Sequence, residues 1–336
     1  MLVVYVPNHR FGHTDTIRVC NANGAFGERE YAIPAYANLD SDGDGLLDTW
    51  ETDGYRVPIT NELIMLKDMG CNPHHKDILV QVDWMRGARP DRSIWTQIET
   101  IFARAPVLNP DGSAGINLHI DHGQDRGTSH PFRLGGKSLP DPATLDFCDY
   151  PNLPGHVTFA ELKKNNFSPT RENLFHYCMF GNGRPDGSTG RAEIWGDDFM
   201  VTFAGTDPED WANPNAQLGT FVHELGHNLG LFHGGWDPGL EDYHERFKWN
   251  QRSSMNYRYQ ISGVPVDREK SSLGVTATYS EGIDTTIIER VLDFGAMKSA
   301  LKLTDVSGQR PATTLLARHG SCVNCSRLGP AHGGTP

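Results

Sequence analysis

Long hydrophobic runs are missing from this chain of 336 residues. The longest apolar stretches, such as residues 2–6 and 78–82, are far shorter than the roughly 20 residues that a helix needs to cross a bilayer. The N-terminal stretch also lacks a basic region and a small-residue cleavage site, so no secretory signal is recognised. These absences argue against a membrane-spanning protein, and we expect no membrane partner.

An excess of positive charge is also missing. The formal net charge is −12, and the Lys and Arg residues are scattered along the chain. Contacts to nucleic-acid phosphates need clustered basic side chains, so we expect no nucleic-acid partner. Part of the acidity is local, because five carboxylates lie between Asp40 and Glu51. That density indicates a cation site rather than a general solvated surface.

Internal repeats and low-complexity tracts are absent, and cysteine is scarce. An even number of cysteines suits disulfide bonds formed in an oxidising compartment, whereas free buried thiols are the alternative. The pairing does not follow from the sequence. We expect a secreted, monomeric protein whose signal or pro-segment is not part of this sequence. The six cysteines are Cys20, Cys71, Cys148, Cys178, Cys322 and Cys325.

Glycine and proline are frequent, with 36 and 21 residues, and predict many loops around a modest number of regular elements. Residues 77–84 and 115–121 are predicted strands, and residues 93–105 between them a helix with one apolar face. This strand–helix–strand order fits a right-handed crossover and therefore a mainly parallel sheet. Further strands are predicted at 173–180 and 198–204, with a short edge segment at 191–195.

The chain is divided into an N-terminal extension at 1–72, a central domain at 73–305 and a C-terminal tail at 306–336. The extension is organised around the acidic loop and contains a predicted helix at 61–69. A polar, Pro- and Gly-rich stretch at 122–156 is predicted to be loop, and a last helix is predicted at 284–294. The fold class is α/β or α+β.

The most informative helix follows Asn213 and Pro214, an N-cap residue and a proline suited to the first helical position. On this helix His223 and His227 are four residues apart and project side by side, so both imidazoles can reach one zinc ion. Glu224 is rotated about the helix relative to both. It is therefore placed to take a proton from a zinc-bound water.

Gly230 tolerates the positive φ at which helices often end, so the chain can turn there and bring His233 back as a third ligand. Three histidines leave one zinc position open for water, which distinguishes a catalytic zinc site from a closed structural one. The alternative is that these are helix-surface histidines that match the pattern by coincidence. The pattern over residues 223–233 fixes five positions in eleven, which disfavours coincidence.

The sequence His-Glu-Leu-Gly-His-Asn-Leu-Gly-Leu-Phe-His at 223–233 resembles the zinc motif of the metzincin clan of zinc endopeptidases. Ser-Ser-Met-Asn-Tyr at 253–257 resembles the Met-turn of the same clan. The resemblance implies that Met255 lies beneath the zinc and that Tyr257 contacts zinc or stabilises the transition state. Gly234 follows the third histidine, unlike the Glu, Pro, Ser or Asp of astacins, serralysins, matrixins and adamalysins. The chain therefore looks more similar to a secreted bacterial branch near the pappalysin-type members.

The resemblance implies a metzincin-like domain with a mixed, mainly parallel twisted sheet, an active-site helix and a C-terminal helix. It also implies a zinc-dependent endopeptidase in which Glu224 is the general base and Tyr257 a donor to the oxyanion. A protein or peptide substrate would lie extended along an edge strand within 190–203. The alternative is a non-catalytic, calcium-stabilised binding module on the same fold. Such a module would be expected to have lost Glu224.

Residues 40–51, Asp-Ser-Asp-Gly-Asp-Gly-Leu-Leu-Asp-Thr-Trp-Glu, follow the twelve-residue pattern of an EF-hand calcium loop. The flanks lack a clear pair of amphipathic helices, so we expect a lone loop with a structural calcium ion rather than a calmodulin-like sensor. An acidic turn without a metal is the alternative. The predicted ligands are Asp40, Asp42, Asp44, the carbonyl of Leu46, Asp48 and Glu51.

Two other groups contain metal-ligating residue types without a spacing that selects a site. The first group, four histidines between residues 74 and 122, is interpreted as exposed or hydrogen-bonded histidines that bind no metal. The second fits a zinc knuckle or a redox pair, but a local disulfide in the tail is the simpler interpretation. The groups are His74, His75, His119 and His122, and His319, Cys322, Cys325 and His332.

Overall fold

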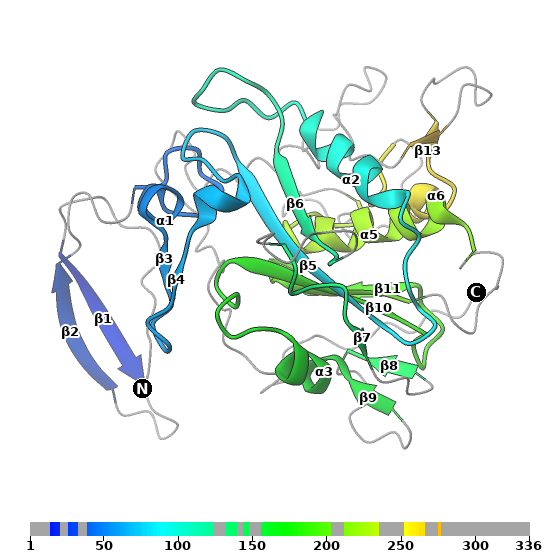
Figure 1. The fold of residues 1–336 in the computed structure, drawn as a ribbon, viewed down its shortest axis with the longest axis horizontal. Helices are drawn as coiled ribbons and strands as arrows, with labels where there is room; N and C mark the ends of the chain where they lie inside the picture. The colour runs from blue at the N-terminus through cyan, green and yellow to red at the C-terminus, as the bar shows by residue number, and fades with distance from the viewer. Residues whose placement is uncertain are drawn as a thin grey trace.

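The centre of the protein is a six-stranded sheet in which five strands have the order β11-β12-β10-β5-β6 and β7 pairs with β5 (Figure 1). The computed structural model describes residues 14–20, 26–32, 39–123, 132–139, 144–147, 156–202, 212–234, 252–265 and 275–276. Of 14–20, 26–32, 144, 156, 265 and 275–276 it describes the backbone alone. The strands of the sheet are β5 (Asp77–Met85), β6 (Asn117–Asp121), β7 (Ser138–Leu139), β10 (Phe175–Gly181), β11 (Gly190–Ala192) and β12 (Asp198–Thr202).

The sheet is mostly parallel, as the sequence predicts. β5 runs parallel to β6, β7 and β10, and β10 runs parallel to β12. Every residue of β5 and β10 is buried, which is typical of strands in the middle of a sheet covered on both faces. At one edge β11 runs antiparallel to β12. A mixed α/β fold is therefore confirmed, with the edge segment close to its predicted place.

Helices cover both faces of the sheet, and Figure 1 shows α2 and α5 on one side and α3 on the other. The helix α2 (Ile94–Ala103) connects β5 to β6 as a crossover, and α5 is Pro214–Asn228. Their apolar side chains pack on β5, β10 and β12 in a first cluster. The second cluster lies on the opposite face and includes Phe159 and Leu162 of α3 (Phe159–Asn166). The sheet is thus the middle of three layers.

The second cluster continues into the predicted N-terminal extension. Leu46, Tyr55 and Leu66 are buried in it together with Leu79 and Met85 of β5. A continuous hydrophobic cluster therefore crosses the boundary predicted at residue 72. The elements on the extension side are α1 (Asp48–Asp53), β3 (Tyr55–Arg56), β4 (Leu63–Ile64) and η1 (Leu66–Met69), and β1 (Thr14–Cys20) pairs with β2 (Phe26–Ala32).

The predicted helix at 61–69 is wrong. Only its last four residues form a helical turn, of the 3₁₀ type, because β4 pairs antiparallel with β3 instead. The intervening turn has Asn61 at a φ of 59°, and its N–H donates to the carbonyl of Val57. Asparagine is one of the few residue types that adopts this left-handed conformation readily. Pairing in this short local hairpin has overridden the helical pattern.

Two further differences concern residues 122–166. The stretch predicted as loop contains β7 and β8 (Thr144–Asp146), and β9 (His156–Thr158) pairs parallel with β8. The helix α3 was not predicted, although Thr158 and Glu161 form a complete capping box at its start. That spacing of threonine and glutamate is a recognised N-terminal signal and could have located the helix.

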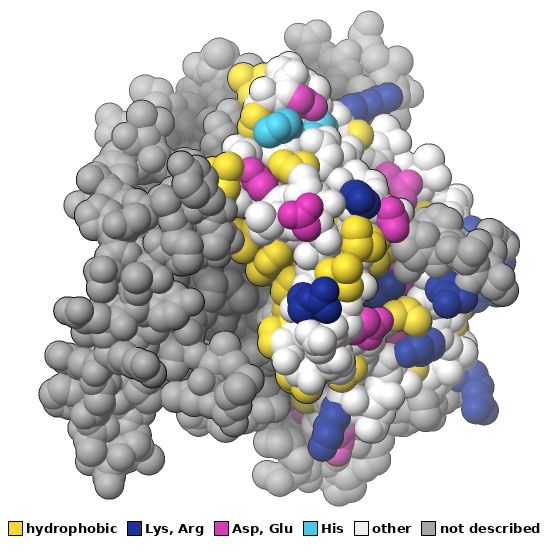
Figure 2. Space-filling view, turned by 60° about the vertical axis from the view of Figure 1, so that its left-hand side comes forward, with side chains coloured by type: hydrophobic (Ala, Val, Ile, Leu, Met, Phe, Trp, Pro, Cys, Tyr) yellow, Lys and Arg dark blue, Asp and Glu magenta, His cyan; other side chains and the backbone are white. Residues whose placement is uncertain are grey.

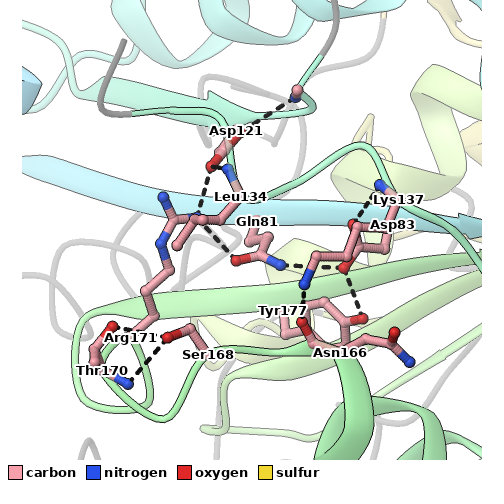
Figure 3. Close-up of polar contacts among 11 residues, drawn as sticks. Gln81, Asp83, Asp121, Leu134, Lys137, Asn166, Ser168, Thr170, Arg171 and Tyr177 are labelled. Atoms are coloured by element: carbon pink, nitrogen blue, oxygen red, sulfur yellow. Dashed lines mark hydrogen bonds and ion pairs between the residues drawn. The ribbon is translucent and has the colours of Figure 1, made fainter. Parts of the chain in front are cut away.

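A buried polar network occupies the second face of the sheet near β5 (Figure 3). The guanidinium of Arg171 donates to Asp121 at 2.6 Å and to the side-chain oxygen of Gln81 at 2.8 Å. The amide of Gln81 and the hydroxyl of Tyr177 both donate to the carboxylate of Asp83. These contacts give buried charges their partners, which such groups require in an apolar layer.

The remaining described elements are short: α6 (Tyr257–Gln260), β13 (Val264–Pro265) and β14 (Val275–Thr276). Among the residues that the structure describes, no helix is long and apolar enough to cross a bilayer. On the described part of the face in Figure 2, Lys and Arg side chains are interspersed with Asp and Glu. The predicted helix at 284–294 and the tail at 306–336 lie outside the described residues.

Cys71 and Cys178 are buried free thiols, so for these two the alternative of free buried cysteines holds. The thiol pKa of both is raised, chiefly by burial, which keeps the thiols protonated. The other four cysteine side chains lie outside the described part of the chain. The predicted disulfides therefore stay a prediction for those four.

Candidate metal centre

The helix α5 begins as the sequence predicts. Asn213 is its N-cap, the Asn213 side chain accepts a hydrogen bond from the N–H of Asn215 at 3.0 Å, and Pro214 is the first helical residue. Every residue from Ala216 to Asn228 is buried. At Gly219 a Cβ would come within 1.8 Å of the carbonyl oxygen of Gln260, so glycine allows α6 to pack closely on the helix. The histidines of α5 are therefore held inside the fold.

The end of α5 turns the chain back toward the helix. Gly230 has a φ of 87°, its N–H donates to the carbonyl of His227, and the N–H of Leu231 donates to the carbonyl of Gly226. This pair of hydrogen bonds is the Schellman motif, which glycine favours because it adopts positive φ without strain. The reversal returns His233 to His227, as predicted.

Three histidines converge through their ring nitrogens. The Nε2 atom of His227 lies 3.2 Å from that of His223 and 3.1 Å from that of His233. Ligand nitrogens of a tetrahedral zinc ion, each about 2.0–2.1 Å from the metal, would be about 3.3 Å apart. One ligand atom from each histidine lies within 4.8 Å of the others. The observed spacing therefore fits three ligands of one zinc ion.

Hydrogen bonds on the far side of two rings orient these nitrogens. Nδ1 of His223 donates to the carbonyl of Ser254 at 2.7 Å, and Nδ1 of His227 donates to the carbonyl of Leu231 at 2.8 Å. A proton on Nδ1 leaves the Nε2 lone pair of a neutral ring free to bind a metal. Burial lowers the pKa of His223 well below its usual value and that of His227 to about 4. Both rings are consequently neutral near pH 7.

Glu224 follows His223 on α5, and its side chain faces the edge strand β11. Its side chain is 5% exposed, and a Cβ built on Gly190 of β11 would come within 2.4 Å of its Oε1 atom. Burial raises the pKa of Glu224 to about 8, while the charges of Arg184 and Arg191 lower it. The carboxyl group is therefore placed between the metal-binding helix and the exposed edge of the sheet, where a general base would be useful.

Two residues of the segment 253–257, Ser254 and Tyr257, contact the histidines. Met255 is fully buried in the first cluster with Leu225, and the carbonyl of its neighbour Ser254 orients His223. Tyr257, the first residue of α6, has its ring centroid 4.6 Å from that of His233 and 5.5 Å from that of His223. The structure thus places Tyr257 next to two of the histidines, while the predicted place of Met255 beneath a zinc ion stays a prediction.

The predicted calcium loop folds around its own carboxylates. Asp40 accepts hydrogen bonds from the N–H groups of Gly43 and Gly45, and Gly45 makes the sharp turn at a φ of 98°. Carboxylate oxygens of Asp40, Asp42 and Asp44 lie within 4.8 Å of one another. The backbone N–H of the buried Leu46 donates to Asp44. These residues form the ring of oxygens that calcium ligation would use.

Asp48 and Glu51 differ in where they point. The carboxylate of Asp48 accepts hydrogen bonds from the N–H and the hydroxyl of Ser41, at 2.8 and 2.7 Å. Glu51 is 1% exposed and belongs to a group with Asp44. Burial and neighbouring carboxylates raise the pKa of Glu51 to about 9 and that of Asp42 to about 7. The charge of the group is thus poorly compensated, a condition that a bound cation would relieve.

Sequence reasoning missed Asp77, which lies in the same group as Asp44 and Glu51. It is far from the loop in sequence, and no motif connects them. His119 contacts Asp77 through Nε2 at 2.5 Å, and His122 stacks on Trp95 at 5.1 Å between ring centroids. Both histidines have ordinary structural contacts, as interpreted from the sequence.

No family model matches this chain, and a search of curated proteins finds no match either. The interpretation of the two centres therefore rests on their geometry. The histidine centre has three convergent nitrogens, a carboxylate and a tyrosine, whereas the acidic centre has oxygen donors from the loop. Zinc suits the first donor set and calcium the second.

Proposed function

We propose that this protein is a zinc-dependent endopeptidase of the metzincin type. The observation that carries the proposal is the convergence of the Nε2 atoms of His223, His227 and His233 on the helix turn that also carries the buried Glu224. Three protein ligands and one open position are typical of a catalytic zinc ion rather than a structural one. A zinc ion held there would polarise a peptide carbonyl and acidify a water molecule.

The chain's own residues have separate roles in this reaction. The three histidines hold the metal as neutral ligands, and two of them are fixed by hydrogen bonds to backbone carbonyls. Glu224 takes a proton from the attacking water and delivers it to the leaving amine. The hydroxyl of Tyr257 donates a hydrogen bond to the oxygen of the attacked carbonyl as negative charge develops there.

The substrate in this proposal is a protein or peptide in an extended conformation. Antiparallel β11 is the edge strand next to β12, and its residue Gly190 lies against Glu224. An extended peptide that adds to this edge gains backbone hydrogen bonds and passes the general base. The edge strand is therefore the proposed substrate-binding surface.

Calcium is the second proposed cofactor, held by the loop at 40–51 in a structural role. Asp40, Asp42, Asp44 and Glu51 supply carboxylates, and Leu46 supplies a carbonyl oxygen at the position that the EF-hand pattern requires. Asp48, bound to Ser41, contributes to the shape of the loop instead. We also propose that the protein is secreted and acts as a monomer.

The second candidate function is a non-catalytic binding module. The buried carboxyl group of Glu224 favours the peptidase over this module. A module without activity has no use for a buried carboxyl group beside three convergent histidines, because burial of such a group costs free energy. Cleavage of a peptide library, with and without a zinc chelator, tests the proposal. We expect cleavage that the chelator abolishes and added zinc restores, and cleavage unaffected by chelation would refute it.

A further inference from the structure

A buried carboxylate group links the acidic loop to the central sheet. Asp77, the first residue of β5, lies with Asp44 and Glu51, and one carboxylate oxygen from each is within 4.8 Å of the others. All three residues are buried, with exposed fractions of 2%, 8% and 1%. Asp44 also belongs to the group with Asp40 and Asp42. Five carboxylates from two parts of the chain therefore form one continuous centre.

Several of these oxygens have no partner among the residues that the structure describes. Both carboxylate oxygens of Glu51 and Oδ2 of Asp42 are buried without a hydrogen bond. The charge of Lys76 lowers the pKa of Asp40 and Asp42, but this is one cation in a centre of five carboxylates. Buried charges without a partner are strongly unfavourable. The oxygens of Glu51 thus point to a bound cation.

We propose that Asp77 joins the calcium centre as a ligand, so that the ion connects the loop at 40–51 directly to β5. Calcium takes six to eight oxygen ligands, so the oxygens of the loop leave room for one more carboxylate. Oδ1 of Asp77 contacts His119, and Oδ2 accepts from the N–H of Asn72. Each carboxylate oxygen has two acceptor directions, so both keep one for a metal.

The donor set selects calcium over a softer metal. The thiol of Cys71 also lies close to Asp77 and His119, which together would resemble a zinc site. That group has one carboxylate, however, whereas the acidic centre that shares Asp77 has five. Five carboxylates are the hard oxygen donors that calcium prefers.

The position of Asp77 connects this centre to the rest of the fold. In Figure 1, α1 with Glu51 lies beside the start of β5. The N–H of Asp77 donates to Asp44 at 2.7 Å, and Asp77 pairs with Asn117 of β6 in the sheet. Calcium bound by Asp77 therefore orders the first residues of β5 as well as the loop, and it stabilises the sheet on which α5 packs.

The inference rests on the proposed calcium loop and is independent of the proposed peptidase activity. Calcium binding is measured by titration calorimetry on the full chain carrying Glu224→Gln, which prevents self-digestion. Adding Asp77→Asn is expected to weaken calcium binding at least tenfold. Adding Asp53→Asn, an exposed carboxylate on the same helix as Glu51, is expected to change it less than threefold. His119→Leu removes the contact to Asp77 but keeps its carboxylate, and is also expected to stay within threefold.

Unchanged calcium affinity in Asp77→Asn would overturn the inference and leave the loop site intact. An equal loss in His119→Leu would also overturn it, because the effect would then belong to the hydrogen bond between His119 and Asp77. Absence of calcium binding in the starting protein would refute the loop and the inference together, and zinc binding in place of calcium would do the same. Hydrogen exchange on the full chain carrying Glu224→Gln alone gives a second test, which does not depend on whether the Asp77 and His119 variants fold. We expect calcium to protect the amides of residues 77–80, and protection confined to 40–51 would contradict the inference.

Discussion

Gly190 of the edge strand and Glu224 of the metal-binding helix lie so close that no side chain fits between them. A Cβ at residue 190 would lie 2.4 Å from Oε1 of Glu224 and 2.8 Å from its Cδ and Cγ atoms. The φ of Gly190 does not lie in the left-handed range, so its backbone conformation does not require glycine. The lack of a side chain at residue 190 therefore determines where the carboxyl group of Glu224 can lie.

Gly190→Ala should displace the general base without removing the metal. A shift of about 1 Å in a catalytic group costs roughly 100-fold in rate, so we expect kcat to fall by about that factor while KM changes little. The measurement is steady-state cleavage of a peptide substrate together with metal analysis. A variant with normal kcat and bound zinc would show that the position of Glu224 does not depend on Gly190.

Gly230→Ala should destabilise the end of α5 for two reasons. The left-handed φ of 87° costs a non-glycine residue about 1–2 kcal/mol, and a Cβ there would lie 2.4 Å from the ring of Trp195. Gly112→Ala is a matched control, since Gly112 has a φ of 86° with nothing within 4 Å of its Cβ position. Denaturant unfolding should show a larger loss of free energy for Gly230→Ala. Equal losses would mean that the contact with Trp195 adds no strain.

Tyr257→Phe should keep the ring but remove the hydroxyl. The ring contacts His233 and His223, so zinc content and stability should change little. Loss of one donor to a developing oxyanion costs about 100–1,000-fold in kcat. Initial rates on a peptide substrate measure the change. Activity within twofold of the unaltered protein would remove Tyr257 from the mechanism.

Arg171→Met should be strongly destabilising, because it removes the cation from the buried network in Figure 3. Arg171 and Asp121 are 2% and 0% exposed, and the ion pair between them is 2.6 Å long. Removing one partner of a buried pair costs about 3–5 kcal/mol, since the other charge is left uncompensated. Adding Asp121→Asn should recover part of that loss in denaturant unfolding. A double variant no more stable than Arg171→Met would indicate that Asp121 carries no uncompensated charge.

Local signals in the sequence predicted the elements that local residues control. The start of α5 at Asn213 and Pro214 and its end at Gly230 follow from capping and from positive φ, and both are confirmed. The crossover through α2 follows from apolar periodicity. The capping box of Thr158 and Glu161 was an equally local signal that was not used. These helices and their ends can be predicted because the residues that determine them lie within a few positions of one another in the sequence.

Features that depend on distant contacts could not be predicted in this way. Asp77 lies with Asp44 and Glu51 because β5 begins beside α1. No motif or spacing in the sequence predicts that contact. The contact between Gly190 and Glu224 likewise depends on how α5 packs on the edge of the sheet. Sequence therefore predicts the ligands of each centre better than their surroundings.

The most direct test of the proposed peptidase compares the unaltered protein with Glu224→Gln in metal content and peptide cleavage. Glutamine has nearly the same shape as glutamate but cannot accept the proton from the attacking water. We predict one zinc ion per chain in both proteins and a loss of at least about 1,000-fold in kcat for Glu224→Gln. Cleavage by Glu224→Gln at the unaltered rate, or an unaltered protein that binds no zinc, would contradict the account.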